Sequence, residues 1–205
     1  SIVGLLKKVS ANIGADLAVL FMYSLSAVLL FALFRIPNLK IIPRKYLFGA
    51  TALFVVYEIC FSYAIALAQN AQQAIEISLV NYLWPSMTIL MLILFKELNF
   101  NKWVILGLGI SLAGVFYIQT GNGAIDLAAV ISHMQSNPLS YGLAFVGASL
   151  WSLYCVMTKK YSQGHNPISL FFIATSLVLW LKMLVLHPEQ FVHIVQIDAT
   201  TLMYM

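Results

Sequence analysis

Apolar runs of about twenty residues fill most of this 205-residue chain. A helix rises about 1.5 Å per residue, so a run of this length crosses a hydrocarbon core about 30 Å thick. Hydrophobic residues make up 61% of the chain and charged residues only 9%, whereas a soluble domain carries about 25% charged residues. The sequence therefore predicts a protein that has lipid around most of its surface.

The apolar runs predict several complete membrane spans and a partial span at each end. Spans of this length are helices, because strands of outer-membrane barrels alternate over about ten residues and only a helix satisfies its backbone groups within one segment. The complete spans cover residues 17–34, 46–68, 71–95, 103–120, 139–158 and 167–186, and the partial spans cover 1–6 and 200 onward. We expect an all-α bundle of transmembrane helices that is truncated at both ends.

The basic residues indicate how the spans are oriented. If the spans alternate in direction, one side receives Arg35, Lys40, Arg44, Lys45, Lys96, Lys102, Lys159 and Lys160. Lys7 and Lys8 fall on the other side, and Lys182 lies within a span. Short loops rich in Lys and Arg stay in the cytoplasm. The connections expected to face outward are residues 69–73, 121–138 and 187–198. The net charge of +4 is spread over small loops, which argues against a nucleic-acid partner.

Two parts of the chain show a weak internal similarity. Residues 1–8 and 152–159 each run from a serine to a lysine of a Lys-Lys pair, and a Ser-Leu step follows in the next span at Ser24 and at Ser176. The matched helices are the first and the sixth spans. They are five spans apart, and an odd separation means that the two helices cross the membrane in opposite directions. This pattern indicates an inverted repeat, a common plan of secondary transporters. Chance similarity among apolar helices is the alternative.

An ionisable side chain in the middle of a span usually faces an internal cavity, because lipid disfavours it. Glu58 has this position, and Thr51 and Ser62 lie on the same helical stripe. The stripe favours the wall of a cavity. The alternative is a carboxylate that is held in a hydrogen bond between helices.

The span at 71–95 carries the most polar residues. Glu76 lies near its outer end, and Asn81, Tyr82 and Trp84 precede Pro85. Proline removes a backbone donor and clashes with the carbonyl four residues earlier, so it predicts a helix kink at this point. A kink beside an amide and aromatic rings is suited to a pocket for polar, flat molecules. The alternative is a packing kink in which Asn81 joins two helices.

The span at 139–158 has an aromatic face and a face of small residues. Trp151 and Tyr154 recur at helical spacing and are further candidates for substrate contact. Ala144, Ala148 and Ser152 form a track that we interpret as a surface for close helix packing.

Other polar residues receive no functional assignment. Lys182 lies one turn from an outer helix end and is expected to extend its ammonium toward the interface. The two cysteines show no disulfide or metal spacing. The histidines have no metal spacing either, and they are His133, His165, His187 and His193. No metal and no cofactor are predicted.

Four motifs together resemble one transporter family. The motifs are Tyr-Glu-Ile-Cys at 57–60, Ala-Ile-Glu at 74–76, Asn-Tyr-Leu-Trp-Pro at 81–85, and Trp151 with Tyr154-Cys155. They are similar to the YddG-type aromatic amino acid exporters of the drug/metabolite transporter (EamA) superfamily, which are multi-pass proteins of bacterial inner membranes.

The resemblance implies a ten-helix fold of two inverted five-helix repeats around a central cavity. Residues 1–120 would form the first repeat, with an incomplete first helix, and residues 139–205 would begin the second, truncated after its second helix. The implied activity is export of aromatic amino acids and related metabolites without a cofactor. Together with the residue patterns, it gives a set of predicted substrate-binding residues, with Pro85 as the helix kink: Glu58, Glu76, Asn81, Tyr82, Trp84, Trp151 and Tyr154.

Two other functions stay open at this stage. A broader metabolite or drug exporter of the same superfamily would share the fold and the orientation. A membrane-embedded enzyme could use Glu58 or Glu76 as an acid or base, but it would need a second convergent catalytic group. The sequence offers no histidine within a span and no metal-binding cluster for that role, so it predicts a transporter and not an enzyme.

Overall fold

The computed structural model describes residues 9–11, 13–34, 38–120, 127–186 and 188. Within these ranges the chain is helical and contains no strand. The helices are α2 (Ala15–Phe34), α3 (Arg44–Ala66), α4 (Ala71–Asn81), α5 (Trp84–Leu94), α6 (Lys102–Thr120), α7 (Leu127–Ser136), α8 (Pro138–Tyr161) and α9 (Ile168–Leu186). The predicted all-helical fold class is confirmed. The predicted partial spans at 1–6 and from 200 onward lie outside the described residues.

The described part of the chain contains five helical stretches that are long and apolar enough to cross a membrane: α2, α3, α4 with α5, α8 and α9. In α6, the apolar stretch Lys102–Gly114 is shorter. Many large apolar side chains are exposed on these helices, including Leu33, Phe48 and Val185. Apolar surface of this extent marks contact with lipid or with other protein and is unusual in a soluble monomer.

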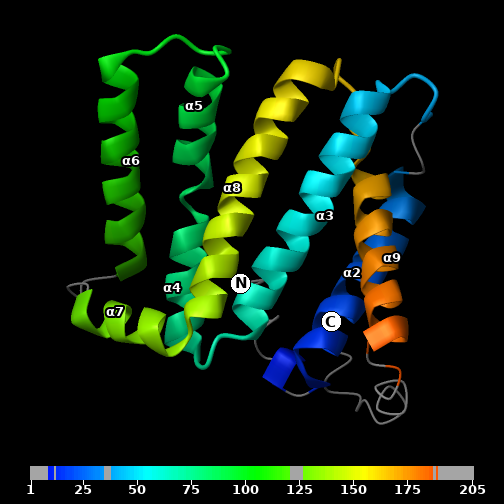
Figure 1. Cartoon of the computed structure of the whole chain (residues 1–205), viewed down its shortest axis with the longest axis horizontal. Coiled ribbons are helices and arrows are strands. Elements are labelled where there is room, and N and C mark those ends of the chain that lie inside the picture. The colour runs from blue at the N-terminus through cyan, green and yellow to red at the C-terminus, as the bar shows by residue number, and fades with distance from the viewer. Residues whose placement is uncertain (1–8, 12, 35–37, 121–126, 187, 189–205) are drawn as a thin grey trace.

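Helices α3 and α8 pack side by side in the centre of the bundle (Figure 1). Helix α2 pairs with α9 on one flank, and α9 also contacts α3. Helices α4 and α5 pack against α8, and α6 lies at the opposite edge of the molecule. The chain thus places the elements that carry the predicted site residues around the α3–α8 pair.

The small-residue track on α8 allows the close contact between α8 and α3. Ala144, Ala148 and Ser152 are fully buried, as predicted for a packing surface. Gly147 of the same helix has the backbone amide of Phe61 and the ring of Tyr57 as its nearest neighbours. A methyl group at Gly147 would make ordinary contact with α3 at Tyr57, Cys60 and Phe61, so only a larger side chain would press on α3 there.

The predicted kink in the fourth span is a complete interruption. Helix α4 ends at Asn81, residues 82–83 form a turn, and α5 starts at Trp84 with Pro85 in its first turn. Proline suits the first turn of a helix because the amide that it lacks has no partner there in any case. At the other end, the Asn70 side chain caps α4 by accepting a hydrogen bond from the Gln73 amide at 2.8 Å.

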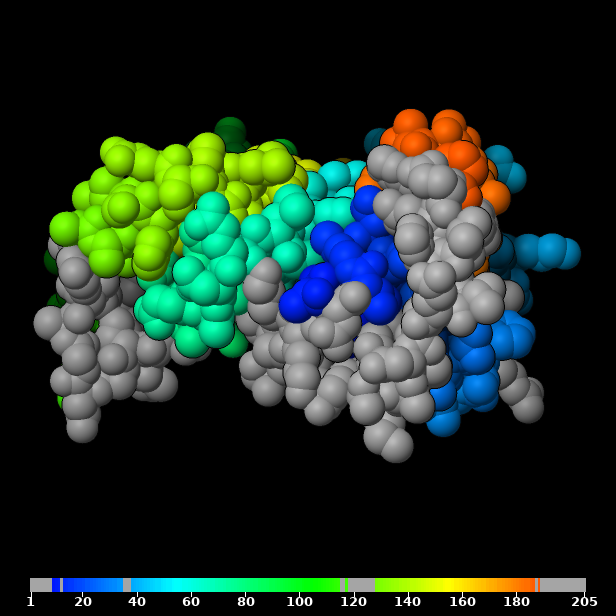
Figure 2. All heavy atoms as spheres, turned by 90° about the horizontal axis from the view of Figure 1, so that it is seen from below, coloured from blue at the N-terminus to red at the C-terminus, as the bar shows by residue number. Residues whose placement is uncertain are grey.

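Helix α7 was not predicted, since we expected residues 121–138 to be a connection. It runs across the end of the bundle, between the end of α6 and the start of α8 (Figure 1). Figure 2, viewed from below, shows α7 beside α4 on this end face. Val130, Ile131 and Met134 follow the spacing of an amphipathic helix. Ten residues are too few for a span, so the search for long apolar runs missed this helix.

The basic loops lie together at the end of the bundle opposite α7 (Figure 1). Lys160 at the end of α8 forms an ion pair of 2.6 Å with Glu97 in the α5–α6 connection. The Lys159 ammonium donates to the Glu97 carbonyl at 3.2 Å. The hydrogen bond from Lys160 lowers the pKa of the Glu97 carboxyl below its ordinary value. The described basic loops thus share one end of the bundle, as predicted, whereas Lys7, Lys8 and Arg35 lie outside the described residues. That this end faces the cytoplasm stays a prediction.

We predict that the two ends of the bundle differ in their access to an impermeant maleimide. Asn101→Cys lies at the basic end and Gln135→Cys lies on α7, and both positions are exposed. In spheroplasts of cells that produce the full-length protein without Cys60 and Cys155, position 135 should react directly, because α7 is on the outer side. Position 101 should react only after permeabilisation. The reverse pattern would contradict the orientation.

Candidate functional site

An aromatic cluster joins α3, α5 and α8. The Trp151 ring of α8 lies 4.6 Å from the Tyr57 ring of α3, measured between centroids, and 4.9 Å from the Tyr154 ring. Trp84 of α5 meets Trp151 edge-on at 6.2 Å. The structure therefore brings together three predicted site residues, Trp84, Trp151 and Tyr154. It adds Tyr57, which belongs to the 57–60 motif but was not predicted as a site residue.

One side of the cluster continues into the packed interior. Phe54 of α3 contacts Trp151 at 6.0 Å and Tyr154 at 5.8 Å. It also contacts Phe171 and Phe172 of α9, each at 5.3 Å. Phe54 and Phe171 are almost fully buried, whereas Trp84 and Trp151 are half-buried. The two tryptophans therefore form the more accessible side of the cluster.

The interruption between α4 and α5 places a polar group beside these rings. Asn81 is 8% exposed, and its side-chain oxygen has no hydrogen-bond partner among the described residues. Its amide lies beside the Tyr57 hydroxyl. The hydroxyl of Ser152 on α8 donates to the Trp84 carbonyl at 2.9 Å. A buried acceptor without a partner is costly, and it is therefore available to a ligand that brings a donor.

Glu58 is tied to the neighbouring helix. The Tyr23 hydroxyl of α2 donates to the Glu58 carboxylate and also lies 3.0 Å from the Ser62 hydroxyl. Glu58 and Ser62 thus share one face, as predicted from their spacing. Thr51 does not join this group in the structure, because its hydroxyl donates to the Leu47 carbonyl of its own helix.

Glu76 belongs to a separate group at the α7 end of the bundle. Glu76 is 6% exposed, and its carboxylate accepts a hydrogen bond from the Tyr141 hydroxyl of α8. The His133 Nδ1 atom of α7 lies 3.0 Å from the same carboxylate. The structure therefore gives Glu58 and Glu76 different partners on different helices. His133 had no assigned role, because its partner is distant in the sequence and α7 was not predicted.

Tyr82 and Pro85 lie at the interruption and are exposed. The Tyr82 ring is 46% exposed and is not part of the aromatic cluster defined above. The Tyr82 backbone amide donates to the Ser78 carbonyl at 3.0 Å and so closes the last turn of α4. The structure connects Tyr82 to the site through its backbone position, and its role in substrate binding stays a prediction.

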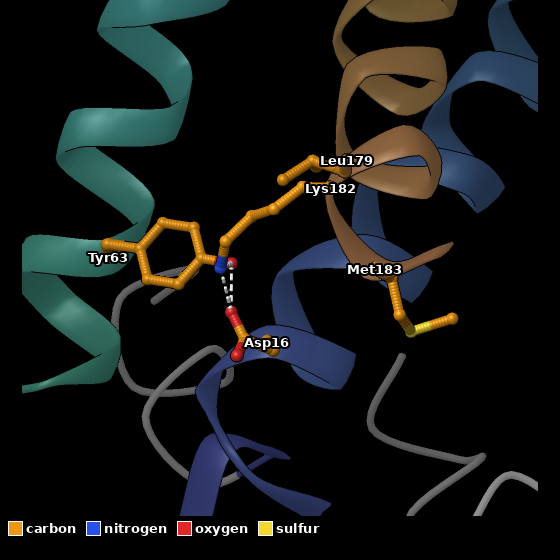
Figure 3. A pocket seen from close by; sticks show the side chains of 5 residues that line it. All are labelled: Asp16, Tyr63, Leu179, Lys182 and Met183. Atoms are coloured by element: carbon orange, nitrogen blue, oxygen red, sulfur yellow. Dashed lines mark hydrogen bonds and ion pairs between the residues drawn. The ribbon is translucent and has the colours of Figure 1, made fainter. Parts of the chain in front are cut away.

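A second polar group lies where α2, α3 and α9 meet near the α7 end. Lys182 of α9 forms an ion pair with Asp16 of α2, and its ammonium donates to the Tyr63 hydroxyl of α3 at 2.9 Å (Figure 3). The Tyr63 hydroxyl donates to the same Asp16 carboxylate. Lys182 was expected to extend its ammonium toward the interface; in the structure this ammonium pairs with Asp16 and Tyr63 near the end of the bundle, and its position relative to the membrane stays a prediction.

Metal binding receives no support from the part of the chain that the structure describes. There, His, Cys, Asp and Glu side chains form no group of three or more that could hold a metal ion. The polar groups instead combine single carboxylates with tyrosine hydroxyls, one histidine and one lysine.

Comparisons with known proteins identify two similar exporters. The chain is 41% identical over 181 residues to the aromatic amino acid exporter YddG of Salmonella typhimurium and 40% identical over 180 residues to the protein of the same name from Escherichia coli. Each match covers 88% of this chain and about 62% and 61%, respectively, of the relative. No family model and no solved structure matches the chain.

The similarity and the five spanning helices together support a multi-pass protein of the bacterial inner membrane. The relatives are named as exporters, which points away from an enzyme. The resemblance inferred from the four motifs is confirmed: over 88% of its length, this chain is similar to two proteins named aromatic amino acid exporter YddG, and it spans less than two thirds of the length of each.

Proposed function

We propose that the full-length protein exports aromatic amino acids and related metabolites and that this chain supplies much of the substrate pathway. The observation that carries the proposal is the aromatic cluster of Tyr57, Trp84, Trp151 and Tyr154 beside the unpaired oxygen of Asn81. Its occurrence in a chain about 40% identical to named exporters supports the same reading.

The chemistry of an aromatic amino acid matches this pair of features. Its ring is flat and apolar and would stack on Trp151 or meet it edge-on, as Trp84 does now. Its ammonium group can donate a hydrogen bond to the Asn81 side-chain oxygen, which has no partner among the described residues. Glu58, on the same helix as Tyr57, would supply negative charge toward the ammonium once Tyr23 releases it. Glu76 and Tyr82 would contact the substrate at a later point of the pathway.

We further propose that the chain spans one five-helix repeat and the start of its inverted copy. Helices α2 and α9 would be equivalent members of the two repeats, and they pack directly against each other. The Ser24 hydroxyl of α2 lies 3.1 Å from the Ser176 hydroxyl of α9, and these serines belong to the matched Ser-Leu steps. Equivalent residues meet in this way when a pseudo-twofold axis passes between them, as in inverted repeats.

The role of a membrane enzyme is less compatible with the site. Glu58 and Glu76, the two candidate acids, are each hydrogen-bonded to a tyrosine and belong to separate groups. An acid/base mechanism needs a second catalytic group that converges on the same reacting atom. We therefore propose that neither carboxylate performs chemistry on a substrate.

We predict that Trp151→Ala in the full-length protein weakens export of phenylalanine by about three- to tenfold, because aromatic pairs contribute about 0.5–1.5 kcal/mol beyond burial. Export of alanine and threonine should change much less, since these substrates do not stack. Efflux from preloaded cells or proteoliposomes measures both. Trp103→Ala is the matched control, because Trp103 is exposed at the start of α6. Equal loss for all substrates would show that Trp151 is structural.

We predict that Asn81→Leu lowers phenylalanine export by about ten- to a hundredfold, because a hydrogen bond to a charged group contributes about 1.5–3 kcal/mol. Thermal stability should change little, since the change removes a buried acceptor without a partner as well as the contact of the Asn81 amide with the Tyr57 hydroxyl. Ser140→Ala is the matched control: its hydroxyl oxygen is also buried without a partner, but it lies about three turns before Trp151 on α8. If both variants exported at the unmodified rate, Asn81 would have no part in recognition.

A further inference from the structure

The Asp16–Tyr63–Lys182 group lines a small pocket that the aromatic cluster does not use. The wall of the pocket is completed by Leu179 and Met183 of α9 (Figure 3). Asp16 accepts from the Lys182 ammonium and from the Tyr63 hydroxyl. The ammonium also lies 4.5 Å from the centroid of the Tyr63 ring. The pocket thus combines a carboxylate, an ammonium, a phenol and an apolar wall.

The position of the pocket suits a site at the outer mouth of the bundle. Asp16 lies in the first turn of α2 and Lys182 near the end of α9, and both helix ends are on the side opposite the basic loops. The two charged side chains are 28% and 34% exposed, respectively. Leu179 and Met183 are buried beneath them. The two charged side chains are therefore partly accessible, whereas the apolar wall is not.

The ion pair can exchange partners with a zwitterion without leaving a charge unpaired. The ammonium of an α-amino acid would take the place of the Lys182 ammonium at Asp16, and its carboxylate would pair with Lys182. The number of opposite-charge contacts rises from one to two, and each remains charge-assisted. The face of the Tyr63 ring, now beside the Lys182 ammonium, can hold either cation. A structural ion pair alone does not require an aromatic face beside its ammonium.

We propose that Asp16, Tyr63 and Lys182 form an outer subsite for the zwitterionic head group of an α-amino acid, in which Asp16 holds the ammonium and Lys182 the carboxylate. The site is distinct from the aromatic cluster, because its polar residues come from α2 and α9 as well as α3. The inference rests on the proposed function, since export of amino acids is what brings a zwitterion to this end of the bundle.

The test measures binding to the purified full-length protein, so that it does not depend on transport. Three probes compete with labelled phenylalanine: phenylalanine itself, phenylalanine amide, which lacks the carboxylate, and 3-phenylpropionate, which lacks the ammonium. Lys182→Met should lower the preference for phenylalanine over the amide by about tenfold, because a charge-assisted contact is lost. Asp16→Asn should lower the preference over 3-phenylpropionate to a similar extent. Lys182→Arg should keep both preferences.

The control pair is Glu97 and Lys160 at the opposite end, whose side chains are 26% and 41% exposed. Glu97→Gln and Lys160→Met should leave both preferences unchanged. The proposal is overturned if Asp16→Asn and Lys182→Met weaken all three probes equally or leave the preferences unchanged, because the pair would then only hold helices together. If the neutral variants do not fold, Lys182→Arg still tests the subsite. Loss of either binding preference in that folded variant would contradict the proposal.

The failure of the proposed function has a different signature. In that case, the unmodified protein in proteoliposomes would not export phenylalanine, whatever its binding preferences. If the unmodified protein exports phenylalanine normally and the two neutral variants bind all three probes as it does, only the outer subsite is contradicted. The two measurements therefore separate the subsite from the function on which it rests.

Discussion

The close contact between α3 and α8 determines the position of the aromatic site. Small residues on α8, among them Ala144, Gly147 and Ala148, let its backbone approach α3. In a membrane, helices gain little from excluding water, so close packing of this kind is a main source of their association. The approach brings Tyr57 against Trp151, and the next residue of α8, Ser152, donates to the Trp84 carbonyl at the start of α5. A bulky residue at Gly147 would act on α3, where Tyr57, Cys60 and Phe61 are its nearest neighbours.

At three places in the bundle, a tyrosine hydroxyl donates a hydrogen bond to a carboxylate on a neighbouring helix. A carboxylate among apolar helices needs donors, and a phenol can supply one from a neighbouring helix while its ring stays in apolar surroundings. Tyr23 does so for Glu58, Tyr141 for Glu76 and Tyr63 for Asp16. Each of these hydrogen bonds joins two helices. The bonds that stabilise the carboxylates therefore also hold the helices together. Local polarity and helix packing are therefore not independent in this protein.

The sequence predicted the helical class, five of the six complete spans and a kink at Pro85, because these follow from run length and from local backbone chemistry. The structure shows the predicted span at 103–120 with a shorter apolar stretch and the kink as a break between α4 and α5. The sequence also placed Trp84, Trp151 and Tyr154 among the site residues, and the structure brings them together. It could not predict contacts between distant segments. Lys182 and Asp16 are 166 positions apart, and His133 meets Glu76 through a helix too short to be recognised as a span. Those contacts depend on which face of each helix is turned toward its neighbours. Hydrophobic periodicity does not define that face in helices that are apolar on nearly all sides.

Helix α7 has a mechanical consequence because of where it is fastened. It lies between α6 and α8, and the contact between His133 and Glu76 holds it to α4. Directly after α7, the side-chain amide of Asn137, which caps α8, donates to the Leu67 carbonyl at the end of α3 at 3.0 Å. Any movement of α4 relative to α8 would therefore have to carry α7 along or break its contact with Glu76.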